Sequence, residues 1–224
     1  MPGTAAVSLD DLGITQEVEA RLGIPGFNPV SELLQLYPRQ AVISVMGSML
    51  VDPSNADGLD LVVHLARQQD LPDEGVSQAQ LEPVVFMNAF AQALRDRYDG
   101  SGLMVAAQLG WILLQTSQGS LRIHIQMVSM SPLGEGINME QPAGLFGEFI
   151  PLLPYFALEG SPALDVFQQH IQALPEEALA QSLDRWYQTL LASAESAHEE
   201  QPARPRVWAR FLAMAAYGAG DRVF

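Results

Sequence analysis

Apolar and polar residues alternate most strictly between residues 121 and 127. A period of two predicts a β-strand with one buried face and one polar face. The buried face would carry Leu121, Ile123, Ile125 and Met127, and the polar face Arg122, His124 and Gln126. We therefore expect the three polar side chains to project side by side from one face of a sheet.

A second apolar run, residues 103–114, precedes this strand. It is apolar at both parities, which is typical of a strand covered on both faces, although residues 106–108 are also compatible with a helix. The polar connector 116–120 contains Gly119, which can adopt the positive φ that hairpin loops of this length often require. The pattern predicts a central β-hairpin at about residues 103–130.

Helical periodicity accounts for most of the other apolar positions. A lone hairpin is only marginally stable in water, so helices or a third strand must cover it. Apolar stripes and capping residues predict helices over residues 15–22, 29–37, 59–69, 77–98, 162–174, 175–191 and 205–217. Residues 41–51 are apolar without a clear period. They are compatible with a strand or a helix, and we expect a strand beside the hairpin.

These elements predict an α+β fold, a helix-rich single domain packed around a small antiparallel sheet that contains the central hairpin. The domain is expected to span residues 14–192, after a flexible N-terminus at residues 1–13. Residues 193–204 are polar and acidic and predict a linker. Residues 205–224 predict a C-terminal helix that packs on the domain or on a partner.

The composition excludes several kinds of chemistry. The 224-residue chain has no Cys, which excludes disulfides, thiolate zinc sites and cysteine nucleophiles. Its formal net charge is −15, from 26 acidic and 11 basic residues, and every basic residue is Arg. The absence of Lys excludes Schiff-base chemistry and a P-loop. Because the excess charge is negative, we expect no nucleic acid partner.

The sequence carries no recognisable targeting or membrane signal. The first residues have neither the basic nor the apolar region of a secretory signal. No stretch reaches the roughly 18 to 20 uninterrupted apolar residues that a membrane helix requires. We therefore expect a cytoplasmic protein without membrane insertion.

Recognised catalytic and metal-binding motifs are all incomplete. There is no Gly-x-Ser-x-Gly nucleophile motif, and the Gly-x-Gly pairs at Gly134 and Gly218 lack the third glycine of a dinucleotide fingerprint. Residues 53–64 match a calcium loop only in its middle, because Pro53 and His64 occupy its first and last ligand positions. No two of the four His residues have the four-residue spacing of a helical zinc site. The sequence predicts no catalytic residue, no metal and no cofactor.

The polar face of residues 121–127 is one candidate ligand site. Its residues would be Trp111, Arg122, His124 and Gln126, in a pocket between the hairpin and the helices. Imidazole is the only side chain with an ordinary pKa near neutrality, so His124 could exchange protons if Tyr or carboxylates from elsewhere complete the pocket. The alternative is a solvent-facing strand that binds nothing.

The apolar segment 145–158 is a candidate interaction surface. Its prolines, Pro151 and Pro154, oppose a regular helix, and its apolar residues predict either a patch for a protein partner or burial over the hairpin. The candidate partner-binding residues are Phe146, Phe149, Leu152, Leu153, Tyr155 and Phe156.

Together, the acidity, the apolar segment, the acidic linker and the incomplete motifs favour a non-enzymatic interaction protein. This protein would be an accessory subunit, adaptor or chaperone that docks on a protein partner or self-associates. Two alternatives remain. One is a small-molecule binding or sensing domain, and the other is an enzyme that uses His124 and carboxylates.

Overall fold

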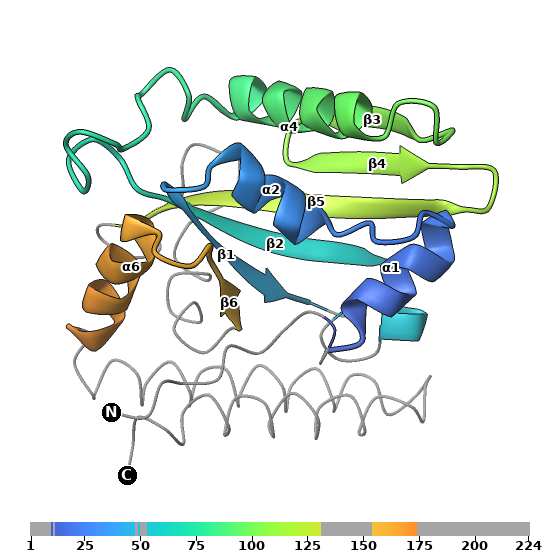
Figure 1. The fold of residues 1–224 in the computed structure, drawn as a ribbon, viewed down its shortest axis with the longest axis horizontal. Helices are drawn as coiled ribbons and strands as arrows, with labels where there is room; N and C mark the ends of the chain where they lie inside the picture. Colours follow the sequence, from blue (N-terminus) through green and yellow to red (C-terminus); the bar gives the residue numbers. More distant parts are fainter. Residues whose placement is uncertain (1–9, 11, 48, 50–52, 131–153, 174–224) are drawn as a thin grey trace, which may run out of the picture.

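The computed structural model describes residues 10, 12–47, 49, 53–130 and 154–173. In chain order the elements are α1 (Ile14–Leu22), α2 (Pro29–Leu36), β1 (Ala41–Met46), the 3-10 helix η1 (Pro53–Asn55), β2 (Gly58–Leu65), α4 (Pro83–Arg97), β3 (Met104–Gln108), β4 (Trp111–Gln115), β5 (Ser120–Ser129), β6 (Tyr155–Phe156) and α6 (Pro162–Gln172) (Figure 1). The domain boundaries predicted near residues 192 and 205 lie outside the described residues and stay predictions.

The strands form one six-stranded sheet in the order β3-β4-β5-β2-β1-β6. Its central pair, β2 and β5, is parallel, and every other neighbouring pair is antiparallel. The predicted small antiparallel sheet in a helix-rich domain is therefore wrong. The sheet is large and mixed, and four α-helices accompany it in the described part of the chain.

The main reason for this error is β2, which the sequence pattern assigns to a helix over residues 59–69. Nearly every residue of β2 is buried, because core packs against both faces of the strand. A strand covered on both faces is a continuous apolar run, and such a run also contains the three- and four-residue spacings of a helical stripe.

The strand predicted within residues 41–51 is β1, but it does not lie beside the hairpin, because β2 separates it from β5. The predicted hairpin needs a correction, because the run 103–114 is two strands, not one. Gly110, at φ +80°, closes a tight turn between β3 and β4. The polar connector then joins β4 to β5 as expected. Gly119 does not adopt the predicted positive φ; a Cβ atom there would instead lie 2.6 Å from the Arg21 carbonyl oxygen.

The helix predicted from residue 77 begins later. Ser77 and Gln80 form one half of a capping box, with the Ser77 amide donating to Gln80 Oε1 over 2.9 Å. That contact stabilises a separate turn, and α4 begins only at Pro83, whose missing amide hydrogen suits the first helical position. Asn28 is the N-cap of α2, since its Oδ1 accepts from the Ser31 amide over 3.0 Å.

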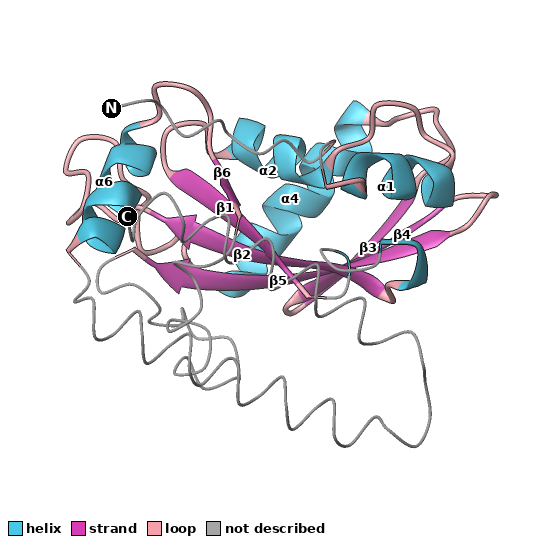
Figure 2. Ribbon diagram, turned by 90° about the horizontal axis from the view of Figure 1, so that it is seen from below, coloured by secondary structure: helices cyan, strands magenta, loops and turns pink. Residues whose placement is uncertain are grey.

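Helices α1, α2 and α4 all cover the same face of the sheet (Figure 2). The main core lies between these helices and the sheet and contains three fully buried aromatic rings, Phe27, Phe86 and Phe90. Helix α6 packs on the other face, at the β1 end, through Phe167 and Ile171. Among the described residues, this other face is thus covered at the β1 end, and no described helix packs on that side of β3, β4 and β5.

An ion pair between the buried Glu32 and the half-exposed Arg97 links α2 to the end of α4. The side chain of Glu32 is only 6% exposed, and its Oε1 accepts from the Tyr98 hydroxyl over 2.8 Å and from Arg97 Nε over 2.9 Å. Burial and the bond to Glu32 raise the pKa of Tyr98 to about 12. Tyr98 therefore stays a hydrogen-bond donor to this carboxylate over the whole physiological pH range.

We expect Tyr98→Phe to lower the free energy of unfolding by about 1 to 3 kcal/mol, because it removes a hydrogen bond from a buried carboxylate. Urea denaturation measures this change. Tyr155→Phe is the matched control, since the Tyr155 hydroxyl has no hydrogen-bond partner in the described part of the chain. Equal stability of both variants and the wild type would contradict the role given to this bond.

Candidate functional site

Polar side chains gather on the open face of β2, β4 and β5. On β5, Ile123 and Ile125 point into the core, so Arg122 and His124 point outward. The strand register then sets two cross-strand rows. One row contains Trp111, His124 and Asp60, and the other contains Leu113, Arg122 and Gly58.

Asp60 and His124 form a hydrogen-bonded pair at the centre of this face. His124 Nδ1 lies 2.9 Å from Asp60 Oδ1, and the two side chains are 51% and 31% exposed. Burial raises the pKa of Asp60 above its ordinary value, and the charge and hydrogen bond of His124 oppose this only in part. With the proton on Nδ1, the imidazole donates to Asp60 and leaves Nε2 as a free acceptor at the surface.

Arg122 lies beside this pair and has no carboxylate partner among the described residues. Its guanidinium carbon is 5.2 Å from the centroid of the Trp111 ring, a cation–π distance. In the described part of the chain, Arg21, Arg39 and Arg97 each pair with a glutamate, whereas Arg67 and Arg95, like Arg122, form no ion pair there. Arg122 therefore places a positive charge, unpaired among these residues, beside the Asp60–His124 pair.

Two glycines determine the shape of this site. A Cβ atom on Gly58 would lie 2.6 Å from the carbonyl oxygen of Arg122, so only glycine permits this approach of β2 to β5. Gly47, at φ +79°, follows β1, and a Cβ there would overlap Asp60 Oδ2. Side chains at these positions would displace the groups that form the site.

This arrangement can perform proton transfer and can bind an anion. A carboxylate bonded to one imidazole nitrogen fixes the tautomer and stabilises the imidazolium that forms when the other nitrogen takes a proton. A guanidinium binds carboxylate or phosphate through paired N–H donors. Arg122 and His124 are two residues apart on a strand, a separation of about 7 Å, so one small molecule can contact both.

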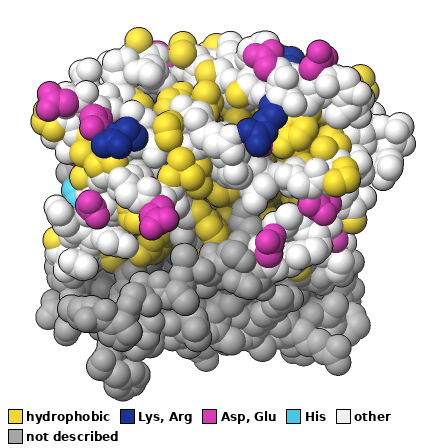
Figure 3. All heavy atoms as spheres, in the orientation of Figure 1, with side chains coloured by type: hydrophobic (Ala, Val, Ile, Leu, Met, Phe, Trp, Pro, Cys, Tyr) yellow, Lys and Arg dark blue, Asp and Glu magenta, His cyan; other side chains and the backbone are white. Residues whose placement is uncertain are grey.

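Three of the four candidate ligand-binding residues are neighbours, as the sequence pattern predicts. Trp111, Arg122 and His124 lie together, and Gln126 is next along the same face, half-buried. They face away from α1, α2 and α4, so the expected pocket between the hairpin and these helices does not contain them. The helix-bearing face, seen in Figure 3, shows charged side chains scattered among apolar ones, not gathered into one site.

Asp60, Gly47 and Gly58 are site residues that the sequence pattern does not predict. The error has one cause, the assignment of β2 to a helix, which hides the pairing of Asp60 with His124. A usable signal is present, because Asp60 is the only acidic residue in the apolar run from Gly58 to Ala66. A single carboxylate inside such a run is expensive to bury and indicates a partner or a function.

His64 forms a second, separate polar contact below α6. Its Nε2 lies 2.9 Å from Ser44 Oγ, both side chains are fully buried, and its ring packs 4.7 Å from that of Phe167. Burial lowers the pKa of His64 to about 3. This histidine is neutral at physiological pH and is out of contact with solvent, so we assign it to the core.

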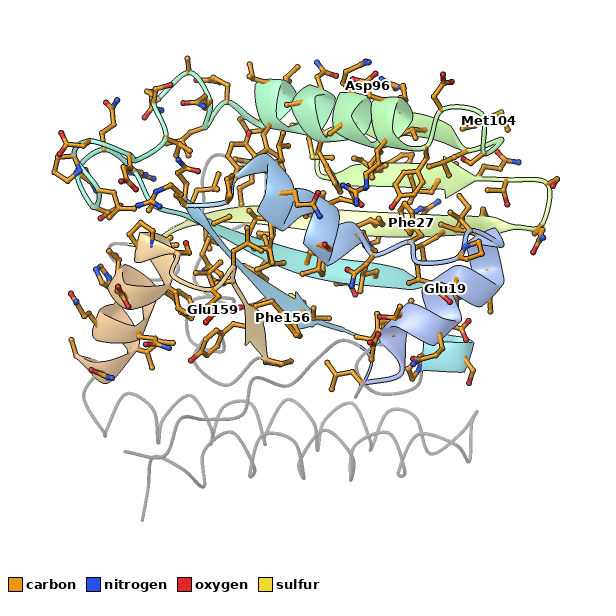
Figure 4. The ribbon with its side chains drawn as sticks, in the orientation of Figure 1. Glu19, Phe27, Asp96, Met104, Phe156 and Glu159 are labelled. Carbon is orange, nitrogen blue, oxygen red and sulfur yellow. The ribbon has the colours of Figure 1, made fainter. Side chains whose placement is uncertain are left out.

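Little of the candidate partner-binding segment can be placed. Phe146, Phe149, Leu152 and Leu153 lie outside the described residues. Tyr155 and Phe156 form β6, where both are half-buried; Figure 4 shows Phe156 on this strand. Tyr155 packs 5.1 Å from the Phe167 ring, and Phe156 packs against the main core. The docking role stays a prediction without support from the structure.

Metal clusters and membrane spans are both absent from the described residues. Among them, no group of three or more His, Asp or Glu side chains could hold a metal ion. None of their helices combines the length and hydropathy needed to cross a membrane.

No protein-family model and no curated protein matches the chain. Weak likenesses to solved structures exist. Terminal uridylyl transferase 4 from Trypanosoma brucei with bound UPU aligns with TM-score 0.29 and 12% identity, over 43% of this chain and 32% of that one. The E. coli MS115-1 CdnC:HORMA-deltaN complex aligns with TM-score 0.33 and 13% identity, over 97% and 60%.

A third likeness is to the Rhodothermus marinus CdnE c-UMP-AMP synthase with Apcpp and Upnpp, with TM-score 0.30 and 13% identity, over 82% of this chain and 67% of that one. Similarities at this level identify neither a fold family nor an activity. The fold and the site define the chain only as an α+β protein with a polar, open sheet face.

Proposed function

We propose that the open face around Asp60, Arg122 and His124 binds a small anionic metabolite, and that the Asp60–His124 pair acts on it as a general base. The observation that carries this proposal is the 2.9 Å hydrogen bond between Asp60 and His124 on an exposed face. A surface histidine needs no such partner for stability, whereas a catalytic imidazole requires one to fix its tautomer.

Arg122 supports the choice of an anion. The guanidinium has no ion pair in the described residues, and the protein's net charge of −15 makes an unpaired cation on its surface a specific attraction for a negative group. When the anionic group of a ligand binds Arg122, the adjacent atoms of the same ligand would lie within reach of His124 Nε2. This nitrogen would take a proton from a substrate hydroxyl or a bound water, and Asp60 would stabilise the resulting imidazolium.

A thermal-shift panel of small carboxylates and phosphate monoesters tests the proposal. A ligand at one hundred times its dissociation constant should stabilise the protein by about 2.7 kcal/mol. We expect Arg122→Gln to weaken binding of the stabilising compound at least tenfold and His124→Gln to weaken it less.

Arg39→Gln and His170→Gln are the matched controls, because Arg39 lies in the turn between α2 and β1 and His170 lies on α6. We expect unchanged binding in both. Two results would contradict the proposed function. One is that no anion in the panel stabilises the protein, and the other is that the binding compound binds equally well to Arg122→Gln.

A further inference from the structure

An apolar strip adjoins the anion-binding group on the same face of the sheet. Val105 and Ala107 of β3, and Ile112 and Leu114 of β4, pack into the main core. The alternate residues therefore face outward. The strip consists of Met104, Ala106, Trp111 and Leu113.

The register places this strip directly beside Arg122. Leu113 pairs with Arg122 across the β4–β5 ladder, and Ala106 pairs with Leu113 across the β3–β4 ladder. Side chains at paired positions lie about 5 Å apart. A chain of aliphatic atoms that begins at the Arg122 guanidinium can thus run over Leu113 and Ala106 to the edge of the sheet.

The strip is accessible and uncharged. Met104 is 60% exposed, and Figure 4 shows it at the outer edge of the sheet, beyond the end of α4. No charged residue occurs in the sequence between Asp99 and Arg122. Among the described residues, no helix covers these four side chains. Arg122 pairs with Leu113 at one border of the strip, and Arg95 donates to the Val105 carbonyl oxygen at the β3 edge over 2.8 Å.

We infer that the ligand of this face is an amphipathic anion with an aliphatic body. Its carboxylate or phosphate would bind Arg122, and its aliphatic chain would lie on the strip. The inference rests on the proposed function, because it assigns the anion to the same guanidinium. Charge complementarity favours this occupant, because the strip offers apolar contact and the Arg122 guanidinium beside Leu113 offers a positive charge.

A series of straight-chain carboxylates, from acetate through butyrate and hexanoate to octanoate, tests the inference by isothermal titration calorimetry below micellar concentrations. Complete burial of one methylene strengthens binding about fourfold at most. On an open sheet face we expect about a twofold gain in affinity for each added methylene.

Two variants locate the effect. Met104→Gln and Leu113→Asn should each flatten the dependence on chain length and leave acetate binding unchanged. Met104 is largely exposed, so its replacement leaves folding intact even if Leu113→Asn does not. Val85→Asn is the control, because Val85 is 49% exposed but lies on α4, and we expect it to keep the wild-type dependence.

The outcomes separate the two proposals. Equal affinity for all four carboxylates, with loss of binding in Arg122→Gln, would overturn the inference that an aliphatic chain binds the strip, and would leave the anion site intact. This result is expected if the strip instead serves a protein partner. A chain-length dependence that survives both strip variants would also overturn the inference. Binding that is absent, or unaffected by Arg122→Gln, would overturn both proposals.

Discussion

Between pH 7 and pH 4 the protein is expected to lose roughly 3 kcal/mol of folding free energy through His64 alone. The pKa of this buried imidazole is lowered to about 3 in the folded protein, whereas the unfolded chain has the ordinary value of about 6.5. As the pH falls from 6.5 towards 3, the unfolded chain takes up a proton that the folded protein cannot accept. Stability is therefore full above pH 6.5 and falls by about 1.4 kcal/mol per pH unit within this window.

Urea denaturation of the wild type and of His64→Gln at pH 7, 5.5 and 4 measures this contribution. Glutamine keeps a hydrogen-bonding group near Ser44 but does not titrate. Other groups, including Asp60 with its raised pKa, are common to both proteins and cancel in the difference. We expect the wild type to lose roughly 3 kcal/mol more than the variant between pH 7 and pH 4. If the free energies of unfolding of the two proteins changed equally with pH, His64 would be accessible to protons in the folded state. That result would contradict its lowered pKa.

Replacing Gly58 by alanine is expected to lower the free energy of unfolding by at least about 2 kcal/mol and to weaken anion binding. A Cβ atom at this position would lie 2.6 Å from the Arg122 carbonyl oxygen, which is closer than real Cβ contacts. The neighbouring atom is backbone, so β2 and β5 must separate at their parallel pairing. That separation displaces both Arg122 and the Asp60–His124 pair from their positions in the site.

Gly100→Ala is the control for this substitution. Gly100 has open space around its missing Cβ, so alanine there meets only the strain of φ +80°, about 1 kcal/mol. Urea denaturation and calorimetric titration of both variants separate a general glycine effect from one at the site. A Gly58→Ala variant as stable as the wild type, with unchanged binding, would contradict the close approach of the two strands.

The outward face of β5 is predictable from the sequence because alternation is a local property. One buried face and one polar face assign each residue by its parity, and this alone places Arg122 and His124 on the open face. Asp60 cannot be placed in this way. Its strand is covered on both faces over most of its length, so its apolar pattern does not distinguish a strand from a helix.

Strand order is also beyond the sequence. Asp60 and His124 are 64 residues apart and meet only because β5 adds to β2 in parallel, after α4, β3 and β4 have intervened in the chain. No local pattern records such a pairing. The N-cap of α2 is predictable because a few neighbouring residues determine it. The position of the turn before β5 is predictable for the same reason, but the positive φ expected at Gly119 is absent.

Function is harder to predict for the same reason. Each of the catalytic motifs considered above is a local string, and the Asp60–His124 pair is assembled from two strands. The sequence therefore favours a docking protein, because its negative charge and its apolar segment are visible without the structure. Arg122 becomes informative only in the structure, which places it on the Trp111 ring beside the Asp60–His124 pair.

The most direct test of the anion site is an NMR titration with hexanoate that follows the indole N–H signals of the three tryptophans. Trp111→Phe identifies the signal of Trp111, which contacts Arg122. We predict that this signal shifts saturably in the wild type, that the other two stay in place, and that Arg122→Gln abolishes the shift. A Trp111 signal that stays in place, or that shifts equally in Arg122→Gln, would contradict an anion site on this face of the sheet.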